Sequence, residues 1–347
     1  MEISSSLLSW FDLHKRDLPF RKNRNPYRIW VSEIMLQQTK VETVIPFYNN
    51  WIKSYPSIIS VYESNESSLL KSWEGLGYYS RCRNFYKAVK IVCEKYNGVI
   101  PDSWDAFRSL PGVGDYTAGA VLSIAFKKPF IALDGNVKRV MARILGRKKL
   151  SKYNIQRFIS TLGKWLDHKR PGDFNEAMME LGACICIPKA PKCYKCPISK
   201  FCVAHKSGRP LNYPIKRKKE RIPHYTFVGC IIKEKNKILI QKRQDKMLNG
   251  LWEIPNKNVN DIDNINEELN NYINKHYGFD INVKKQLGIV SHSYSHFKMK
   301  LILFECIKLG EIKKYNQMYN WIKKSDVVNY AFHKVNHKIF SLLENDF

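Results

Sequence analysis

The spacing of apolar residues divides the chain into a helical part and a later part that contains strands. Apolar positions recur at helical spacing over residues 2–14, 27–39, 41–54, 66–74, 81–96, 104–109, 116–126 and 174–182, and another helix is expected to begin near Asp134. The alternation typical of β-strands is first found after residue 220, over 227–232, 238–242, 281–283, 288–294 and 298–307, with one helix near 262–276. We therefore predict a multidomain protein in which an all-α domain precedes an α+β domain.

Chain length and a change in composition place the boundary between these parts. Single hydrophobic cores seldom grow beyond about 250–300 residues, so a chain of 347 residues favours two domains. A charged stretch with prolines and few apolar residues begins after His205 and ends near Pro223, which is typical of a linker. The predicted domains are residues 1–205 and 224–347, joined by a linker at 206–223.

The charge of the chain indicates a polyanionic partner. Lys and Arg number 58 against 31 Asp and Glu, for a formal net charge of +27, and nucleic acid fits such a surplus better than a membrane does. Solvated lysines without any ligand are the alternative. The sequence has no apolar run near the roughly 20 residues that span a bilayer, and we expect a soluble, cytoplasmic monomer without membrane contact.

A glycine-rich turn followed by a carboxylate is the first candidate for chemistry. Gly112 and Gly114 lack a Cβ, so the turn between two helices can bring main-chain amides close to a phosphate oxygen. A tight connection in a helical bundle is the alternative. Asp134 follows the next apolar helix at a position where an N-cap is wanted. If Asp134 faced a sugar, the basic residues after it, Arg139, Arg143, Arg147, Lys148 and Lys149, would face phosphate.

Glu33 is a second candidate, because it lies close to the apolar stripe of its helix. A surface position is the simpler interpretation, whereas burial would raise its pKa and let it hold a proton at neutral pH. The same helix ends in Leu36, Gln38 and Thr39. The simpler interpretation is a polar helix end; alternatively, a Gln or Leu there enters a base stack while a nucleotide is extruded.

Nine cysteines are present, and five of them lie between Cys184 and Cys202, which favours metal binding in reduced surroundings over disulfides. Four are spaced Cys-x6-Cys-x2-Cys-x5-Cys, at Cys186, Cys193, Cys196 and Cys202. Four thiolates could hold either a zinc ion or an iron–sulfur cluster. Most structural zinc sites use two close pairs of cysteines, whereas here one close pair is flanked by single cysteines, which favours the cluster. Cys184 falls outside the pattern and is interpreted as a packed thiol.

Four motifs in order resemble those of the helix-hairpin-helix DNA glycosylases, and more narrowly the MutY-type adenine DNA glycosylases. They are Ser32–Thr39, Pro111–Ala118, Leu133–Val140 and the four cysteines. The resemblance covers nearly the whole chain. It implies a helix-hairpin-helix domain with a [4Fe-4S] cluster in loop 186–202, and double-stranded DNA with adenine opposite 8-oxoguanine or guanine as the partner.

The resemblance also implies roles for single residues. Glu33 would protonate adenine N7 and make the base a leaving group, and an ionised Asp134 would stabilise the oxocarbenium sugar. Tyr116 and Asn136 match supporting residues. Endonuclease III, a sister family, carries a lysine nucleophile where this chain has Tyr116, so a monofunctional glycosylase is predicted. Further matches are Arg21 near the expected adenine pocket, Leu36 and Gln38 in the base stack, and Thr39, Leu76 and Tyr78 around the oxidised guanine. Helix termination and core packing are the simpler roles for these residues.

The C-terminal domain resembles the Nudix-like recognition domain of the same family. The match rests on Gly250–Pro255 and on Tyr294, Ser295 and His296, where the family has Phe-Ser-His. Ser295 would bind the oxidised guanine and His296 a phosphate or the base edge. A Nudix pyrophosphatase is an alternative class, but its Gly-x5-Glu-x7-Arg-Glu-x2-Glu-Glu signature does not follow Pro255. A DNA-binding scaffold with a redox-sensing cluster is another, and it would tolerate loss of Glu33 and Asp134.

Overall fold

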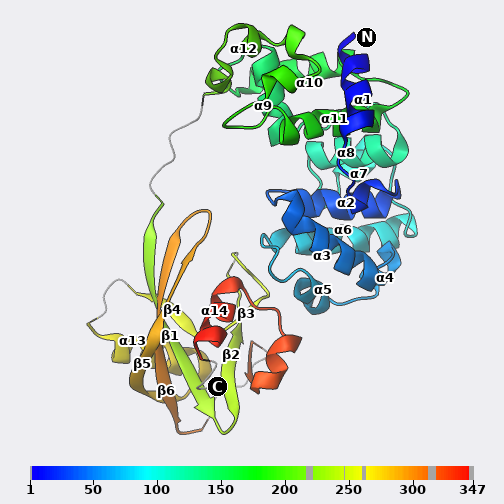
Figure 1. Cartoon of the computed structure of the whole chain (residues 1–347). Helices are drawn as coiled ribbons and strands as arrows, with labels where there is room; N and C mark the ends of the chain where they lie inside the picture. The colour runs from blue at the N-terminus through cyan, green and yellow to red at the C-terminus, as the bar shows by residue number, and fades with distance from the viewer. Residues whose placement is uncertain (1, 216–221, 246, 260–262, 312–317, 344–347) are drawn as a thin grey trace. The chain divides into compact units, whose positions relative to one another are not determined.

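The computed structural model describes residues 2–215, 222–245, 247–259, 263–311 and 318–343. Contacts divide the chain into two units, Met1–Glu63 with Asn84–Lys218 and Ser64–Arg83 with Lys219–Phe347 (Figure 1). Part of the predicted linker, residues 216–221, lies outside the described residues. No helix in the described ranges is both long and apolar enough to cross a bilayer.

The first unit is helical, as predicted. Its helices are α1 (Glu2–His14), α2 (Pro26–Leu36), α3 (Val41–Ser54), α4 (Ile58–Tyr62), most of α6 (Ser80–Tyr96), α7 (Trp104–Arg108), α8 (Asp115–Phe126), α9 (Gly135–Ile144), α10 (Lys152–Trp165), α11 (Pro171–Cys184) and α12 (Val203–Lys206). Helices α4 and α10 were not predicted: α4 is a single turn, and α10 buries only Phe158 and Leu162 fully in a polar sequence. Helix α5 (Glu66–Ser72) belongs to the second unit.

Helix α2, which carries Glu33, has defined ends. Pro26 occupies its first position, and the side chain of Asn25 accepts a hydrogen bond from the Arg28 N–H at 3.2 Å, which caps the helix. The prediction that this helix runs to Thr39 is wrong by three residues. Gln37 has a ψ of 113°, outside the helical region, and Gln38 follows with a left-handed φ of 58°, so the chain leaves the helix here.

Two packed clusters hold the first unit together. One joins α1, α9, α10 and α11 through buried residues that include Phe11, Val140, Phe158 and Phe174. The other is aromatic: Trp30 of α2 meets Phe85 of α6 and Phe107 of α7 edge-on, with ring centroids 4.9 and 5.2 Å apart. Helices α2, α8, α9 and α11 are therefore fixed firmly enough to position side chains between them.

The second unit contains a sheet of seven strands in the order β3-β2-β1-β6-β5, with β4 paired to β1 and β7 to β2. The strands are β1 (His224–Glu234), β2 (Lys237–Lys242), β3 (Trp252–Glu253), β4 (Asn256–Val259), β5 (Asp280–Ser293), β6 (Lys298–Leu309) and β7 (Tyr319–Ile322). Strands β1 and β6 are parallel, and β5 and β6 form an antiparallel hairpin.

Helices cover both faces of this sheet, which confirms the α+β prediction. Val228, Cys230 and Ile232 of β1 pack with α13 (Ile265–Tyr277), whereas Ile231 packs in the cluster that contains α14 (Lys334–Leu342) (Figure 1). The two strands predicted at 281–283 and 288–294 are one strand, β5, because irregularities near Gln286 interrupt its alternation without ending it. The short strands β3, β4 and β7 and helix α14 were not predicted.

Candidate active site

Glu33, Tyr116, Asp134 and Asn136 come together at one cavity of about 140 Å³ in the first unit. Glu33 lies in α2, Tyr116 in the first turn of α8, and Asp134 and Asn136 at the start of α9. The remaining lining residues are Arg16, Leu18, Phe20, Arg21, Ile29, Ser32, Leu36, Thr39, Val41, Ile124, Glu176, Met179, Glu180 and Ala183. The fold thus assembles the predicted carboxylates from segments a hundred residues apart in the sequence.

Glu33 is buried, so the simpler interpretation of it as a surface residue is wrong. Only 6% of the residue is exposed, and the Tyr116 hydroxyl donates a hydrogen bond to Oε2 at 2.5 Å. Burial raises the pKa of Glu33 to about 7; nearby Glu176 and Asp134 add to the rise, whereas the Tyr116 hydrogen bond opposes it. A carboxyl group with this pKa holds a proton part of the time near neutral pH, as a general acid must.

Asp134 caps α9 and lines the cavity with the same carboxylate. Its Oδ1 accepts the Val137 N–H at 2.6 Å, and its Oδ2 accepts the Asn136 side-chain amide at 3.0 Å. Burial raises the pKa of Asp134, but these two hydrogen bonds and the charge of Arg139 act against that rise. The capping interpretation is confirmed, and the cap fixes the carboxylate within the cavity, whereas the role of Asp134 at a sugar stays a prediction.

The prediction that Arg139 and Arg143 face phosphate is wrong, because both point into the protein. Arg139 donates to the Asn136 side-chain oxygen at 3.0 Å and to the carbonyls of Gly182 and Cys186 at 2.8 and 2.9 Å. Arg143 is only 3% exposed and binds main-chain carbonyls of the cysteine loop. These arginines satisfy carbonyl groups that no secondary structure pairs.

Sequence reasoning missed the acidic side of the cavity. Glu176 and Glu180 lie one turn apart on α11, are almost fully buried, and form ion pairs with Arg21 at 3.1 and 2.9 Å. Two glutamates four residues apart in an apolar helix that follows a basic segment were the available signal. Arg21 was predicted to lie near the adenine pocket, and it lines this cavity.

The two glycines of the hairpin turn differ in their structural role. Gly112 has a φ of 80°, and a Cβ there would lie 2.8 Å from Cβ of Asn84, so the turn requires glycine. Gly114 is the N-cap of α8 with φ −94° and open space around it. No side chain caps α8, which leaves its first amides open to another acceptor. Their contact with DNA stays a prediction.

The residues predicted to contact DNA beside the base have different environments. Leu36 and Thr39 line the cavity, and Gln38 is exposed in its left-handed conformation. In the second unit, Tyr78 has a φ of 49° and is 42% exposed, so its ring can meet a partner. Leu76 is only 5% exposed, which favours core packing, the simpler of its two interpretations.

Tyr294, Ser295 and His296 form the turn between β5 and β6. Ser295 and His296 are exposed, whereas the Tyr294 ring packs on Phe297 with centroids 4.8 Å apart. The hydroxyl that distinguishes Tyr294 from a phenylalanine lies 3.4 Å from Nδ1 of His333. The ring thus keeps an apolar contact, and its hydroxyl has a polar neighbour.

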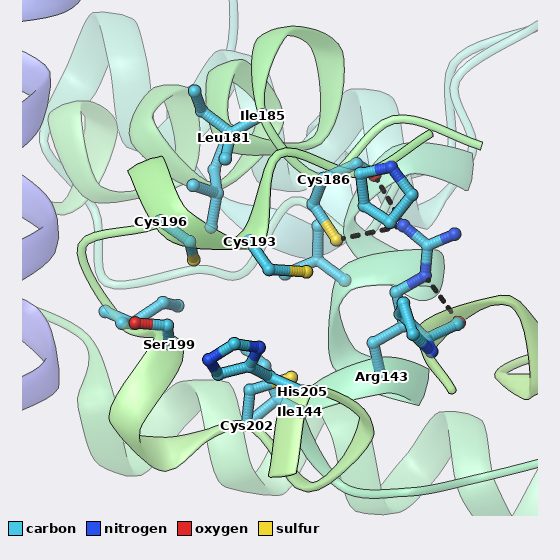
Figure 2. A pocket seen from close by; sticks show the side chains of 14 residues that line it. Arg143, Ile144, Leu181, Ile185, Cys186, Cys193, Cys196, Ser199, Cys202 and His205 are labelled. Atoms are coloured by element: carbon cyan, nitrogen blue, oxygen red, sulfur yellow. Dashed lines mark hydrogen bonds between the residues drawn. The ribbon is translucent and has the colours of Figure 1, made fainter. Parts of the chain in front are cut away.

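The four spaced cysteines line one cavity together, which Figure 2 shows with Cys186, Cys193, Cys196 and Cys202 around it. Arg143 Nη1 donates to Sγ of Cys186 at 3.2 Å. Cys184 does not line this cavity; its Sγ lies 3.5 Å from Oε1 of Glu180. Within the described ranges, no three His, Cys, Asp or Glu side chains gather closely enough to hold a single metal ion.

Two family models match separate parts of the chain. Residues 31–165 match the HhH-GPD superfamily of base excision DNA repair proteins, and residues 227–342 match the NUDIX domain. An adenine DNA glycosylase of Buchnera aphidicola subsp. Schizaphis graminum is 35% identical over 309 residues, which cover 86% of each chain.

Two solved structures resemble the helical part. A thermostable thymine-DNA glycosylase matches with a TM-score of 0.55 and 30% identity, over 59% of this chain and 95% of that one. A trapped endonuclease III–DNA covalent intermediate matches with a TM-score of 0.52 and 25% identity, over 59% and 94%. With its paired carboxylates, its four-cysteine loop and these relatives, the chain belongs to the adenine DNA glycosylase family.

Proposed function

We propose that this protein is a base excision repair enzyme that extrudes an adenine mispaired with 8-oxoguanine or guanine from duplex DNA and hydrolyses its N-glycosyl bond. The observation that carries the proposal is the pair of unlike carboxyl groups at one cavity. Burial raises the pKa of both, to about 7 for Glu33, but at Asp134 two hydrogen bonds from Val137 and Asn136 act against the rise and favour the ionised form. Two carboxyl groups of opposite habit are what hydrolysis of a glycosidic bond requires.

In the proposed reaction, Glu33 transfers its proton to N7 of the adenine, and the bond between the sugar C1′ and N9 breaks with its electron pair going to the base. Asp134 stabilises the oxocarbenium ion that remains. The oxygen of a water molecule then bonds to C1′, and the proton it releases returns to the carboxylate of Glu33. Asn136 holds Asp134 through the 3.0 Å hydrogen bond, and Tyr116 holds Glu33.

We propose further that the enzyme is monofunctional. Tyr116 presents a phenol at the cavity, and a phenol cannot form the Schiff base through which a lysine leads to strand cleavage. The product is then an abasic site in an uncut strand. Borohydride should trap no covalent adduct with DNA, and prompt formation of a stable adduct would contradict this part of the proposal.

Selection between adenines has to come from the base opposite, because adenine itself is undamaged. We assign that task to the exposed Ser295 and His296 of the β5–β6 turn and to Tyr78 with its half-exposed ring. Leu36 and Gln38 at the end of α2 would fill the space that the extruded base leaves, and Thr39 would lie near the oxidised guanine. The site that cleaves the N-glycosyl bond would then lie in the predicted domain 1–205, and the recognition turn in the predicted domain 224–347.

The four cysteines at one cavity fit a [4Fe-4S] cluster, since four thiolates are its usual ligands. Cys186, Cys193, Cys196 and Cys202 would hold it, and it would supply a cross-link that folds loop 186–202. Replacing Cys193 by serine should lower bound iron and inorganic sulfide and the visible absorption of the purified protein. Cys184→Ser is the matched control, because Cys184 lies outside the cavity; equal iron loss in both variants would contradict the ligand set.

One assay tests the proposed activity. Single-turnover reactions are run on duplexes with adenine opposite 8-oxoguanine, guanine or thymine, and abasic sites are revealed by alkali. We expect excision opposite 8-oxoguanine and guanine, and none by Glu33→Gln although that variant should still bind DNA. Inactivity of the unmodified protein on all three duplexes would overturn the proposal.

A further inference from the structure

The turn from Arg16 to Arg21 forms one wall of the cavity and is folded around a single carboxylate, that of Glu180. Oε1 of Glu180 accepts the main-chain N–H of Arg16 at 3.2 Å and its Nε at 2.6 Å. Oε2 accepts Nη2 of Arg16 and Nη2 of Arg21, each at 2.9 Å. Arg21 Nη1 also donates to the carbonyl of Arg16 at 3.3 Å, so the two ends of the turn are tied to each other and to α11.

The charge of Glu180 is present at every pH at which the enzyme can work. Its side chain is 1% exposed, and burial alone would raise its pKa. The hydrogen bonds and charges of Arg16 and Arg21 outweigh burial and lower the pKa of Glu180 to about 2. A buried carboxylate with two arginine partners fixes their geometry, because removing it would leave the mostly buried guanidinium of Arg21 and the partly exposed one of Arg16 each short of a partner.

Arg21 is the member of this group that was matched to the pocket of the extruded base, although Arg16 and Glu180 line the cavity too. Its guanidinium lines the same cavity as Glu33, and it is held from three sides: by Glu180, by Glu176 at 3.1 Å, and by the Phe11 ring 5.4 Å away. An arginine side chain has several rotatable bonds, and a working site needs such a group held to within a fraction of an ångström. Through its two oxygens, Glu180 links the guanidinium of Arg21 to that of Arg16 at the other end of the turn.

We propose that Glu180 is a positioning residue for base excision: by binding Arg16 and Arg21 together, it fixes the Arg21 guanidinium in the cavity that receives the extruded base. This inference rests on the proposed function, since it concerns the same cavity. Glu180 then acts through Arg21 and not on the substrate. A carboxylate that only fastened α11 to the N-terminal segment would affect stability without any specific coupling to Arg21.

Asp173 provides a matched comparison on the same helix. Its carboxylate binds Arg24 at 2.8 Å and Arg170 at 2.8 Å, so it too joins α11 to an arginine of the N-terminal segment. It does not line the cavity. Asp173→Asn therefore removes two partly exposed ion pairs of the same helix and none of the contacts that Arg21 makes itself.

The test is a double-mutant cycle on full-length protein with adenine opposite 8-oxoguanine in single turnover. Glu180→Gln and Arg21→Gln should each lower the rate about 10- to 100-fold, the range that an ångström of misplacement produces. The double variant should be no slower than the slower single variant, because the two changes remove one function. Asp173→Asn should keep the rate, and the thermal midpoint is measured for every variant.

Rate losses that multiply in the double variant, or a rate for Glu180→Gln equal to that of Asp173→Asn, would overturn the inference. Should Glu180→Gln not fold, the cycle is run with Glu180→Asp, whose carboxylate keeps its charge but is too short to reach both arginines. The same non-additive result supports the inference and an additive one overturns it. Failure of the unmodified protein to excise adenine overturns the proposed function and this inference together, whereas excision with additive losses overturns this inference alone.

Discussion

Replacing Glu33 by glutamine should make the protein inactive and more stable at the same time. In the folded state burial raises the pKa of Glu33 from 4.5 to about 7. Between these pH values the folded protein keeps a proton that the unfolded chain has lost, so the free energy of unfolding falls as the pH rises, and it levels off above pH 7. At about 1.4 kcal/mol for each pKa unit, the ionised carboxylate costs the folded state roughly 3 kcal/mol at pH 8.

Glutamine has nearly the same shape, can still accept the Tyr116 hydrogen bond, and carries no charge at any pH. Below pH 4.5 the variant and the original protein should therefore have similar stability. At pH 8 the variant should be more stable by about 3 kcal/mol, which corresponds to a rise of roughly 6–12 °C in the thermal midpoint for a unit of this size. Such a rise in stability would show that burying Glu33, which keeps it protonated near neutral pH, destabilises the folded protein.

Thermal unfolding of both proteins at pH 4.5 and pH 8 measures this difference, with excision measured on the same samples. Glu94→Gln is the control, because Glu94 is an exposed glutamate of α6 and its charge remains in water. A glutamine variant of Glu33 that is no more stable than the original protein at pH 8, or equally stabilised at both pH values, would refute the desolvation argument.

Four further substitutions have expected outcomes. Tyr116→Phe removes the hydrogen bond that lowers the pKa of Glu33, so the pH at which single-turnover excision declines should rise by about one to two units, given roughly 1.5–3 kcal/mol for a hydrogen bond to a charged group; an unchanged pH profile would contradict this. Gly112→Ala should destabilise by about 2 kcal/mol because alanine disfavours left-handed φ, whereas Gly114→Ser, at an open N-cap, should leave the thermal midpoint unchanged or raise it. Tyr294→Phe should change stability by less than about 0.5 kcal/mol, since only a long 3.4 Å contact is lost; a larger loss in denaturant unfolding would show that the hydroxyl is needed.

Local sequence was sufficient for most elements and for the chemistry of the site. Helix α3 has the bounds predicted for it, since its apolar stripe and flanking residues are all local. Helix α10 was missed because its apolar stripe is narrow, and β3 and β7 because two to four residues are too few to display a period. The order of the motifs was enough to name the family, and the structure then brought Glu33, Tyr116 and Asp134 to one cavity.

What only the tertiary structure decided is the environment of those side chains. Desolvation of Glu33 depends on atoms from α8 and α11 that lie far from it in the sequence. Arg139 and Arg143 turn inward because the cysteine loop, more than forty residues later, presents carbonyls that need donors. Glu180 meets Arg16 across 164 residues. Sequence patterns report which groups are present, whereas burial and long-range pairing set their pKa values and orientations, because both depend on neighbours that only the folded chain brings together.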